Sequence, residues 1–179
     1  MSADPARRKG KVSCHDAPPR RMSFEGPRRQ LVLSSGAPER TLEIGRAIGE
    51  LLPEGAVLSL EGGLGAGKTL IAKGICAGLG VSDEVLSPSF VIAEEYAGAF
   101  PVLHFDLYRL DSVDEVARTG LFDAINGRNV VIVEWGDRLP AGVLDADIRI
   151  IMRIVGDTDR TITVESGERA VALLEGGPA

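Results

Sequence analysis

Residues 62–69, with the sequence GGLGAGKT, constrain the possible folds of this chain more than any other segment. They match the pattern G-x-x-x-x-G-K-[ST], in which glycines let the backbone curl so that several N–H groups point inward. Residues 57–60 precede the loop and are apolar, which predicts a buried strand; residues 70–79 follow it with apolar side chains on one helical face. A strand, a glycine-rich loop and a helix N-terminus in this order predict a binding site for phosphate groups.

The individual loop residues have distinct predicted roles. Lys68 is expected to reach the β- and γ-phosphates of a nucleotide, and the Thr69 hydroxyl is expected to hold Mg²⁺. The four specified positions coincide by chance in about one chain of this length in a hundred or fewer, so a glycine-rich turn without function is the poorer explanation. The predicted nucleotide-binding residues of the loop are Gly63, Leu64, Gly65, Ala66, Gly67, Lys68 and Thr69.

Composition indicates one α/β domain. The chain has 179 residues, of which 44% are hydrophobic and 26% charged, as in ordinary globular proteins. No stretch approaches the roughly 18 apolar residues of a membrane span, and the start lacks the apolar core of a secretory signal. Cys14 and Cys76 have no metal-binding spacing and are interpreted as reduced thiols. These features predict a cytoplasmic protein without a membrane association.

The first 29 residues differ from the rest of the chain. Residues 1–30 hold eight Lys or Arg against three Asp or Glu, a local charge of +5 that leaves −11 for the remainder of a chain with net charge −6. Four prolines and little apolar periodicity predict a disordered basic tail, residues 1–29, before a P-loop domain, residues 30–179. The tail could contact RNA, have no role, or be absent if translation starts at Met22. The acidic body argues against broad nucleic-acid binding by the domain itself.

The order of predicted strands and helices indicates a layered α/β domain with a P-loop NTPase-like mixed sheet. Residues 130–133, VVIV, form the most continuous β-branched run and predict a central buried strand. A helix is expected to start at Asp111 or Ser112, where Glu115 completes a capping box. The other predicted elements are a strand at 30–34, a helix at 38–52, a possible hairpin of 91–96 with 102–105, and an antiparallel pair of 148–154 with 161–164.

Two carboxylates follow predicted strands, and a phosphate loop needs a carboxylate near Thr69 to orient Mg²⁺ and its waters. Glu134 follows the apolar run 130–133, and Asp106 follows residues 102–105. Glu134 is expected to contact Mg²⁺ directly. Asp106 is expected either to contact the ligands of the metal without binding the metal itself, or to orient the attacking water. The alternative for each carboxylate is that it only caps the end of its strand and has no part in the chemistry. The predicted catalytic residues are therefore Lys68, Asp106 and Glu134, and the predicted metal ligands are Thr69 and Glu134.

Other polar and aromatic residues near these motifs are harder to assign. Ser87 and Ser89 flank Pro88 in a place where many P-loop enzymes have a switch segment, although an ordinary turn explains the pattern nearly as well. His104 lies in an apolar strand and is interpreted as a core histidine rather than a catalytic one. Trp135 follows Glu134 at the predicted mouth of the site, where it is expected to pack or stack.

Four segments together resemble the TsaE family, small bacterial P-loop ATPases of tRNA N6-threonylcarbamoyladenosine biosynthesis. They are residues 62–69, residues 87–90, residues 104–110 (HFDLYRL) and the pair Glu134-Trp135. The resemblance covers about residues 30–165. It implies ATP and Mg²⁺ as cofactors, and a complex with the TsaD and TsaB subunits in which ATP hydrolysis resets the transferase. It implies only an indirect relation to tRNA.

The resemblance also extends to individual residues. It implies that Ser87 and Ser89 belong to a switch and, more loosely, that Arg160 lies near the nucleotide. Ser89 departs from the Thr that is common in the family but keeps the hydroxyl. Gly136 stands where Pro is common, which is expected to loosen the turn after Trp135.

Two other function classes are compatible with the same loop. A small-molecule kinase would use the loop lysine and an acidic strand end, but the lid candidates Arg109, Arg118 and Arg128 do not cluster. A nucleotide-gated binding module that does not hydrolyse ATP is the third possibility. The absence of an Asn-Lys-x-Asp run favours ATP over GTP.

Overall fold

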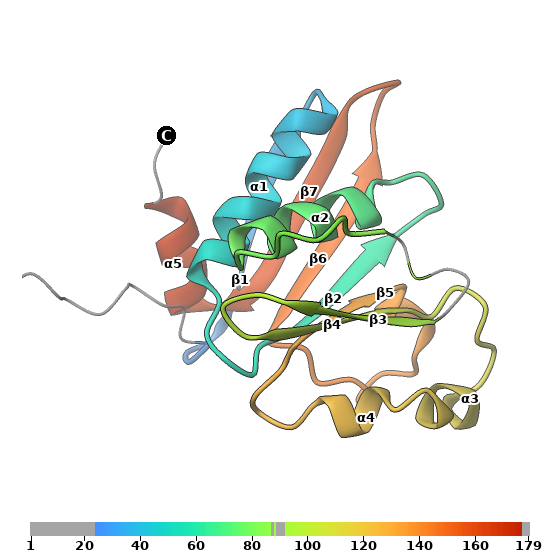
Figure 1. The fold of residues 1–179 in the computed structure, drawn as a ribbon. Coiled ribbons are helices and arrows are strands. Elements are labelled where there is room, and N and C mark those ends of the chain that lie inside the picture. Colours follow the sequence, from blue (N-terminus) through green and yellow to red (C-terminus); the bar gives the residue numbers. More distant parts are fainter. Residues whose placement is uncertain (1–23, 87, 89–91, 177–179) are drawn as a thin grey trace, which may run out of the picture.

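The computed structural model describes residues 24–86, 88 and 92–176 of the chain. A seven-stranded sheet lies between helices (Figure 1). The elements in chain order are β1 (Arg28–Ser35), α1 (Pro38–Leu51), β2 (Val57–Gly62), α2 (Lys68–Gly78), β3 (Ala93–Ala97), β4 (Pro101–Asp106), α3 (Val113–Arg118), α4 (Leu121–Ala124), β5 (Val130–Glu134), a 3-10 turn η1 (Gly136–Arg138), β6 (Ile148–Ile154), β7 (Arg160–Gly167) and α5 (Glu168–Glu175).

The sheet is mixed, as the sequence predicts. Its strand order is β1-β7-β6-β2-β5-β4-β3, and the four central strands β6, β2, β5 and β4 run parallel to one another. β3 pairs antiparallel with β4, and β7 pairs antiparallel with both β6 and β1. The predicted hairpin and the predicted antiparallel pair near the C-terminus are both confirmed.

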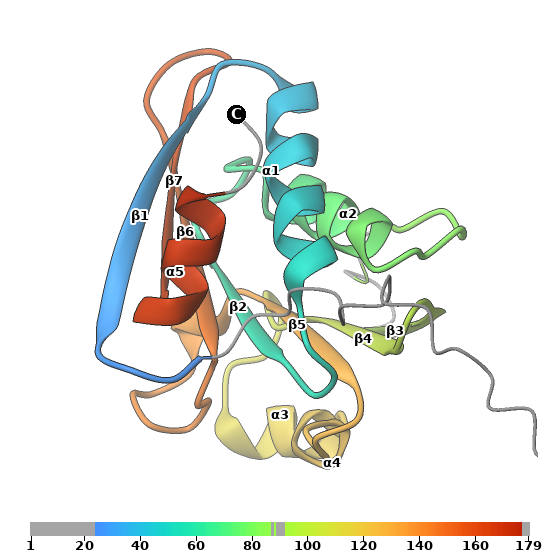
Figure 2. The ribbon, with the colours of Figure 1, turned by 90° about the vertical axis from the view of Figure 1, so that its left-hand side faces the viewer.

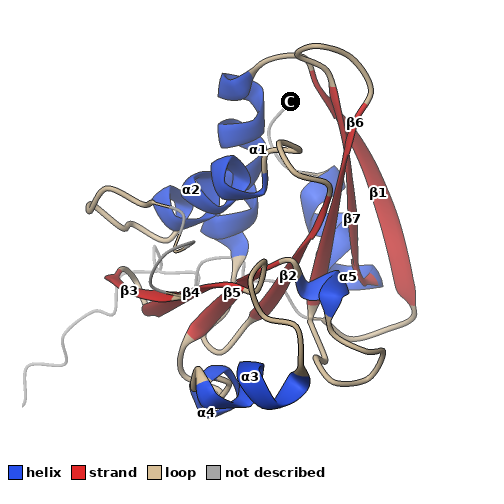
Figure 3. Cartoon of the chain, turned by 90° about the vertical axis from the view of Figure 1, so that its right-hand side faces the viewer, coloured by secondary structure: helices blue, strands red, loops and turns tan. Residues whose placement is uncertain are grey.

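Helices cover both faces of the sheet (Figures 2 and 3). One face packs against α1, α2 and α5, and contributes alternate strand residues such as Leu58, Leu60 and Ile132 to the larger apolar cluster. The opposite face contributes Val131 and Val133 to a second cluster with α3 and α4. β5 is consequently buried on both sides, which is the environment that its unbroken apolar run predicts. None of the helices in the described ranges is long and apolar enough to cross a membrane.

Several boundaries differ from the sequence predictions. β1 begins at Arg28, before the predicted domain start at residue 30, and Phe24 already packs against the main core. Residues 1–23 of the predicted tail lie outside the described residues, so its disorder stays a prediction. α4 and α5 were not predicted, because helices of four and eight residues carry too few turns for a clear periodicity. Ser112 is confirmed as the N-cap of α3, since its hydroxyl accepts the Glu115 N–H.

Helices α1 and α2 approach each other through glycines spaced four residues apart. Gly45 and Gly49 of α1 face Gly74 and Gly78 of α2, and a Cβ added at any of them would collide with backbone of the opposite helix. This contact fixes the position of α2 and hence of the loop from which α2 starts.

We expect Gly49→Ala to destabilise the fold by about 1–3 kcal/mol, because the new methyl group would overlap the Ile75 carbonyl. The intrinsic preference of a helix for Ala acts in the opposite direction and is smaller, up to about 1 kcal/mol. Urea unfolding measures the effect, and Ala47→Ser on the exposed side of α1 is the control. An unchanged or increased stability of Gly49→Ala would show that the helices do not touch here.

Candidate active site

The loop between β2 and α2 has the backbone that its glycines allow. Gly62, Gly65 and Gly67 have φ values of 133°, 75° and 106°, in a region that other residues rarely adopt. Gly67 precedes the first residue of α2 and ends the loop in a left-handed conformation. The curled backbone leads directly into the helix N-terminus, where partial positive charge favours bound phosphate.

The sheet register brings three strand ends to this loop. Leu60 of β2 pairs with Glu134 of β5, and Asp106 of β4 pairs with the same Glu134. Because these strands are parallel, their carboxyl ends lie at one edge, which is where open α/β sheets bind ligands. The edge contains a cavity of about 170 Å³ lined by Leu64, Gly65, Gly67, Lys68, Thr69, Asp106, Tyr108, Glu134 and Trp135.

Glu134 connects the loop with β4. The Thr69 hydroxyl donates to Glu134 Oε2 at 3.1 Å, and His104 Nε2 lies 3.0 Å from Glu134 Oε1. Glu134 is 2% exposed and His104 is fully buried. The histidine therefore lies in the core as predicted, but its partner is the predicted metal ligand. The sequence alone did not indicate this pairing.

The Lys68 ammonium group bonds to its own loop. Nζ donates to the Gly62 and Gly63 carbonyls at 2.7 and 2.9 Å, and it lies 3.3 Å from the centroid of the Trp135 ring. Burial lowers the pKa of Lys68, although Glu134, Asp137 and Asp106 act in the opposite direction. A nucleotide phosphate must take over some of these contacts if Lys68 is to bind it.

Trp135 is held over the loop by an unusual backbone conformation and by aromatic contacts. Its φ is 63°, rare for a residue with a large side chain, and its N–H donates to the Leu60 carbonyl. The Tyr108 ring lies 4.9 Å from the Trp135 ring, and the Tyr108 N–H donates to Asp106 Oδ1 at 2.8 Å. After Trp135 the chain forms η1, where a side chain on Gly136 would overlap Ser59. Tyr108 is thus a site residue that the sequence analysis did not single out.

The remaining predicted residues are placed as follows. Arg160 lies beside the loop: its Nη2 donates to the Gly65 carbonyl at 3.4 Å, and Nη1 donates to three carbonyls of the β6–β7 turn. Ser87 and Ser89 lie outside the described residues. The loop positions Gly63 and Ala66 complete the predicted cradle, and the Ala66 N–H donates to the Gly63 carbonyl.

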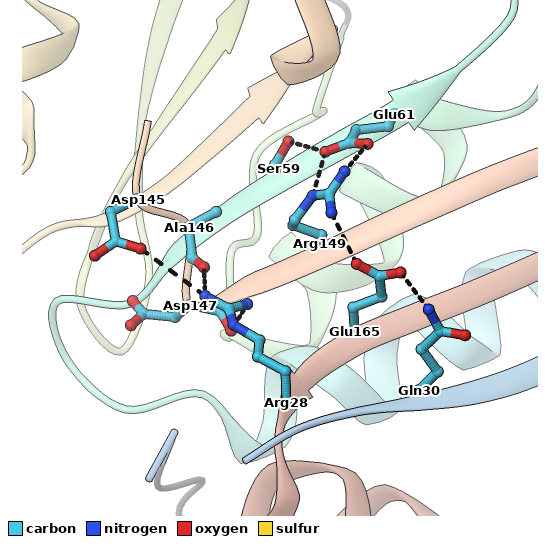
Figure 4. A network of polar contacts seen from close by, with 9 residues as sticks. All are labelled: Arg28, Gln30, Ser59, Glu61, Asp145, Ala146, Asp147, Arg149 and Glu165. Atoms are coloured by element: carbon cyan, nitrogen blue, oxygen red, sulfur yellow. Dashed lines mark hydrogen bonds and ion pairs between the residues drawn. The ribbon is translucent and has the colours of Figure 1, made fainter. Parts of the chain in front are cut away.

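On the face of the sheet opposite to α1, α2 and α5, polar contacts hold in place the strand that leads into the loop (Figure 4). Glu61, next to the loop in β2, accepts two bonds from the Arg149 guanidinium of β6, each of 2.8 Å. Arg149 also bonds Glu165 of β7, which in turn accepts from Gln30 of β1 at 2.6 Å. The chain of contacts crosses four strands, so the end of β2 is anchored to the whole antiparallel side of the sheet.

Comparison with known proteins agrees with this geometry. Residues 35–162 match the family described as "Threonylcarbamoyl adenosine biosynthesis protein TsaE". This chain belongs to the TsaE family. The matched range contains the glycine-rich loop, both carboxylates and Arg160, so the resemblance noted in the sequence is confirmed at the level of the family.

Curated relatives and a solved structure extend over most of the chain. The tRNA threonylcarbamoyladenosine biosynthesis protein TsaE of Treponema pallidum is 36% identical over 73% of this chain and 96% of its own length. The protein of the same name from Bacillus subtilis is 37% identical over 82% of this chain and 93% of its own. The crystal structure of Bacillus subtilis YdiB has a TM-score of 0.64 and 34% identity, and it covers 85% of this chain and 96% of its own.

The donor set of this TsaE-family site fits Mg²⁺ bound together with a nucleotide. Oxygen donors suit Mg²⁺, and the Thr69 hydroxyl and the Glu134 carboxylate are adjacent in the structure. Among the described residues no group of three or more His, Cys, Asp or Glu could hold a metal ion by itself. The remaining ligands would have to be phosphate oxygens and water, which is how Mg²⁺ is usually bound in such enzymes.

We expect nucleotide binding to change the fluorescence of this TsaE-family protein. Trp135 is the single tryptophan of the chain, and Lys68 lies against its ring. When phosphate draws Lys68 away, the ring loses a nearby positive charge, so the emission maximum and intensity should change. Titration with ADP and Mg²⁺ measures the response, and Lys68→Met should abolish it. A saturable response of equal size in Lys68→Met would show that the lysine contact is not involved.

Proposed function

We propose that this protein is an Mg²⁺-dependent ATPase that acts in the threonylcarbamoyladenosine modification of tRNA in the cytoplasm. The observation that carries the proposal is the convergence of a phosphate loop, Thr69 and two strand-end carboxylates on one cavity. Membership in the TsaE family supports the pathway, and the ATPase activity is inferred from the geometry. The 170 Å³ cavity is smaller than the roughly 300–1,000 Å³ of most ligand sites, so it suits the phosphate end of a nucleotide with the base outside.

The residues at the strand edge would divide the work. The loop N–H groups and Lys68 bind and orient the phosphates, while Thr69 and Glu134 hold Mg²⁺. Bound Mg²⁺ would neutralise charge that develops on the transferred phosphoryl group. Asp106 would orient the attacking water or the outer waters of the metal. Arg160 would support the loop from the side of Gly65, and Ser87 and Ser89 would belong to a segment that responds to the γ-phosphate.

The described part of the site lacks one component of fast hydrolysis. Arginine fingers that stabilise the transition state raise rates by about 10³–10⁵-fold, and no arginine of the described residues lines the cavity. Arg138 does not line the cavity: its guanidinium bonds to Asp111 and lies 5.9 Å from the centroid of the Tyr108 ring. We therefore propose slow hydrolysis by the isolated protein and acceleration by the TsaD and TsaB subunits, whose cycle the hydrolysis would reset.

Single-turnover ATP hydrolysis tests this function directly. We expect slow turnover by the protein alone and an increase of at least about tenfold with purified TsaB and TsaD, a lower bound well below the effect of a complete arginine finger. Glu134→Gln is the control for hydrolysis at this site. Rapid turnover that partners leave unchanged would indicate a stand-alone ATPase. Phosphate transfer to a small molecule would favour the kinase alternative, and binding without turnover in the presence of partners would favour a nucleotide-gated binding module.

A further inference from the structure

His104 has a feature that a merely space-filling core residue would lack. It is fully buried, its Nε2 lies 3.0 Å from Glu134 Oε1, and its Nδ1 is the one buried side-chain nitrogen or oxygen among the described residues without a hydrogen-bond partner. Leaving a polar atom unpaired in the core is unfavourable, so a histidine at this position requires an explanation, and the contact of its other nitrogen with Glu134 provides one.

The partners of Glu134 determine which tautomer fits. A carboxylate only accepts hydrogen bonds, so Nε2 must carry a proton in order to donate to Oε1. Nε2 is therefore the donor in this hydrogen bond, and Nδ1 is the ring atom that has no partner among the described residues.

The two oxygens of Glu134 have separate partners. Oε1 lies against His104, while Oε2 accepts from Thr69, the predicted ligand of Mg²⁺, and the carboxylate lines the phosphate cavity. Rotation of the carboxylate about its terminal bond would break both contacts at once. The rotation of a Glu carboxylate about this bond is otherwise broad and poorly restricted. His104 thus fixes one oxygen so that the other is presented to the loop.

The strand positions support the same arrangement. His104 and Asp106 are two residues apart on β4 and lie on the face that also carries Glu134 on β5, because Asp106 is its register partner. This face also packs against α2, through Val102 and Ile132. The histidine therefore lies behind the catalytic edge, inside the core, and does not line the nucleotide cavity.

We propose that His104 is a positioning residue for metal binding: it orients the Glu134 carboxylate so that Oε2 and the Thr69 hydroxyl form one Mg²⁺ site with the nucleotide. The proposal rests on the proposed nucleotide function of the cavity. It assigns to a buried histidine a role that neither its exposure nor its sequence context indicates. Groups that orient metal ligands typically contribute about 10- to 100-fold to metal affinity.

The test compares His104→Leu, His104→Gln and His104→Asn with wild type. Leu keeps an apolar side chain of moderate size but has no donor. Gln places an amide N–H close to the position of Nε2, whereas the shorter Asn places it near Nδ1. Val102→Ala on the same face of β4 is the control for general loosening of the core. Two affinities are measured on folded protein, that of ADP in EDTA and that of Mn²⁺ for the ADP complex by electron paramagnetic resonance.

We expect His104→Leu and His104→Asn to weaken Mn²⁺ binding by about 10- to 100-fold and to leave ADP binding in EDTA within about threefold of wild type. His104→Gln should recover most of the Mn²⁺ affinity, and Val102→Ala should change both affinities little or equally. If His104→Leu does not fold, the comparison of His104→Gln with His104→Asn still decides the question.

Three results would overturn the proposal. Wild-type Mn²⁺ affinity in His104→Asn would show that the histidine is not needed at the metal site. An equal loss of ADP affinity in EDTA and of Mn²⁺ affinity, matched by Val102→Ala, would show a purely structural role. If wild-type protein bound no ADP under either condition, the proposed nucleotide function itself would fail, and this inference with it.

Discussion

Lys68→Ala should weaken the binding of ATP and Mg²⁺ by about a hundredfold or more while the protein stays folded. The ammonium group lies at the loop, with bonds of 2.7 and 2.9 Å to its carbonyls, where it can turn to a phosphate with little movement. Bonds between charged groups contribute about 1.5–3 kcal/mol each, and Lys68 would provide more than one to the β- and γ-phosphates. Calorimetric titration of ATP with Mg²⁺ measures the loss.

The other lysine of α2 supplies the matched control for this measurement. Lys73→Ala removes the same charge from the same helix, but Lys73 does not line the cavity. Its ATP affinity should stay within about threefold of wild type, because Lys73 is half-buried outside the cavity and salt weakens the effect of a charge that does not contact the phosphates. An affinity of Lys68→Ala that matched Lys73→Ala would count against the loop as the phosphate site.

Glu134→Gln should lower the single-turnover rate of ATP hydrolysis by about a hundredfold or more and weaken ATP binding much less. The substitution keeps the size of the side chain but removes the charge that faces Thr69, and an electrostatic contributor of this kind typically supplies about 10²–10³ in rate. Rapid-quench measurement at saturating ATP separates the rate from binding. Glu95→Gln on the exposed side of β3 is the control and should hydrolyse ATP at the wild-type rate.

Asp106→Asn tests how the two carboxylates divide their roles. Asp106 accepts the Tyr108 N–H, and it lines the same cavity as Glu134. We assign the metal to Glu134 and the attacking water or outer metal waters to Asp106. A severe loss in Asp106→Asn together with normal turnover in Glu134→Gln would reverse this assignment.

Motifs with a strict local pattern allowed much of the fold and site to be predicted. The loop glycines require positive φ at Gly62, Gly65 and Gly67, and the run before Glu134 required a strand buried on both faces. Both features are determined by residues that are adjacent in the sequence, so they could be predicted without knowledge of the tertiary structure. Asp106 and Glu134 were each singled out because they follow apolar strands, and the structure shows that these two strands are parallel neighbours, which brings both carboxylates to one edge.

Contacts across the sheet could not be predicted in this way. His104 is thirty residues from Glu134, and its pairing depends on which strands are neighbours and in which register. The stacking of Tyr108 on Trp135 and the anchoring of Glu61 by Arg149 arise from the same tertiary arrangement. Short elements such as α4 also depend on packing, here through Leu121 and Ala124 in the second cluster, and not on local periodicity.

A crystal structure with Mg²⁺ and a non-hydrolysable ATP analogue tests the central claim most directly. We predict that the β- and γ-phosphates lie within the loop of residues 62–69 and that Lys68 Nζ leaves the Gly62 and Gly63 carbonyls to contact them. Mg²⁺ should lie beside the Thr69 hydroxyl and the Glu134 carboxylate. The analogue bound instead in the larger cavity of about 670 Å³ that Glu61 and Arg149 line, with Lys68 still on its own carbonyls, would contradict the account.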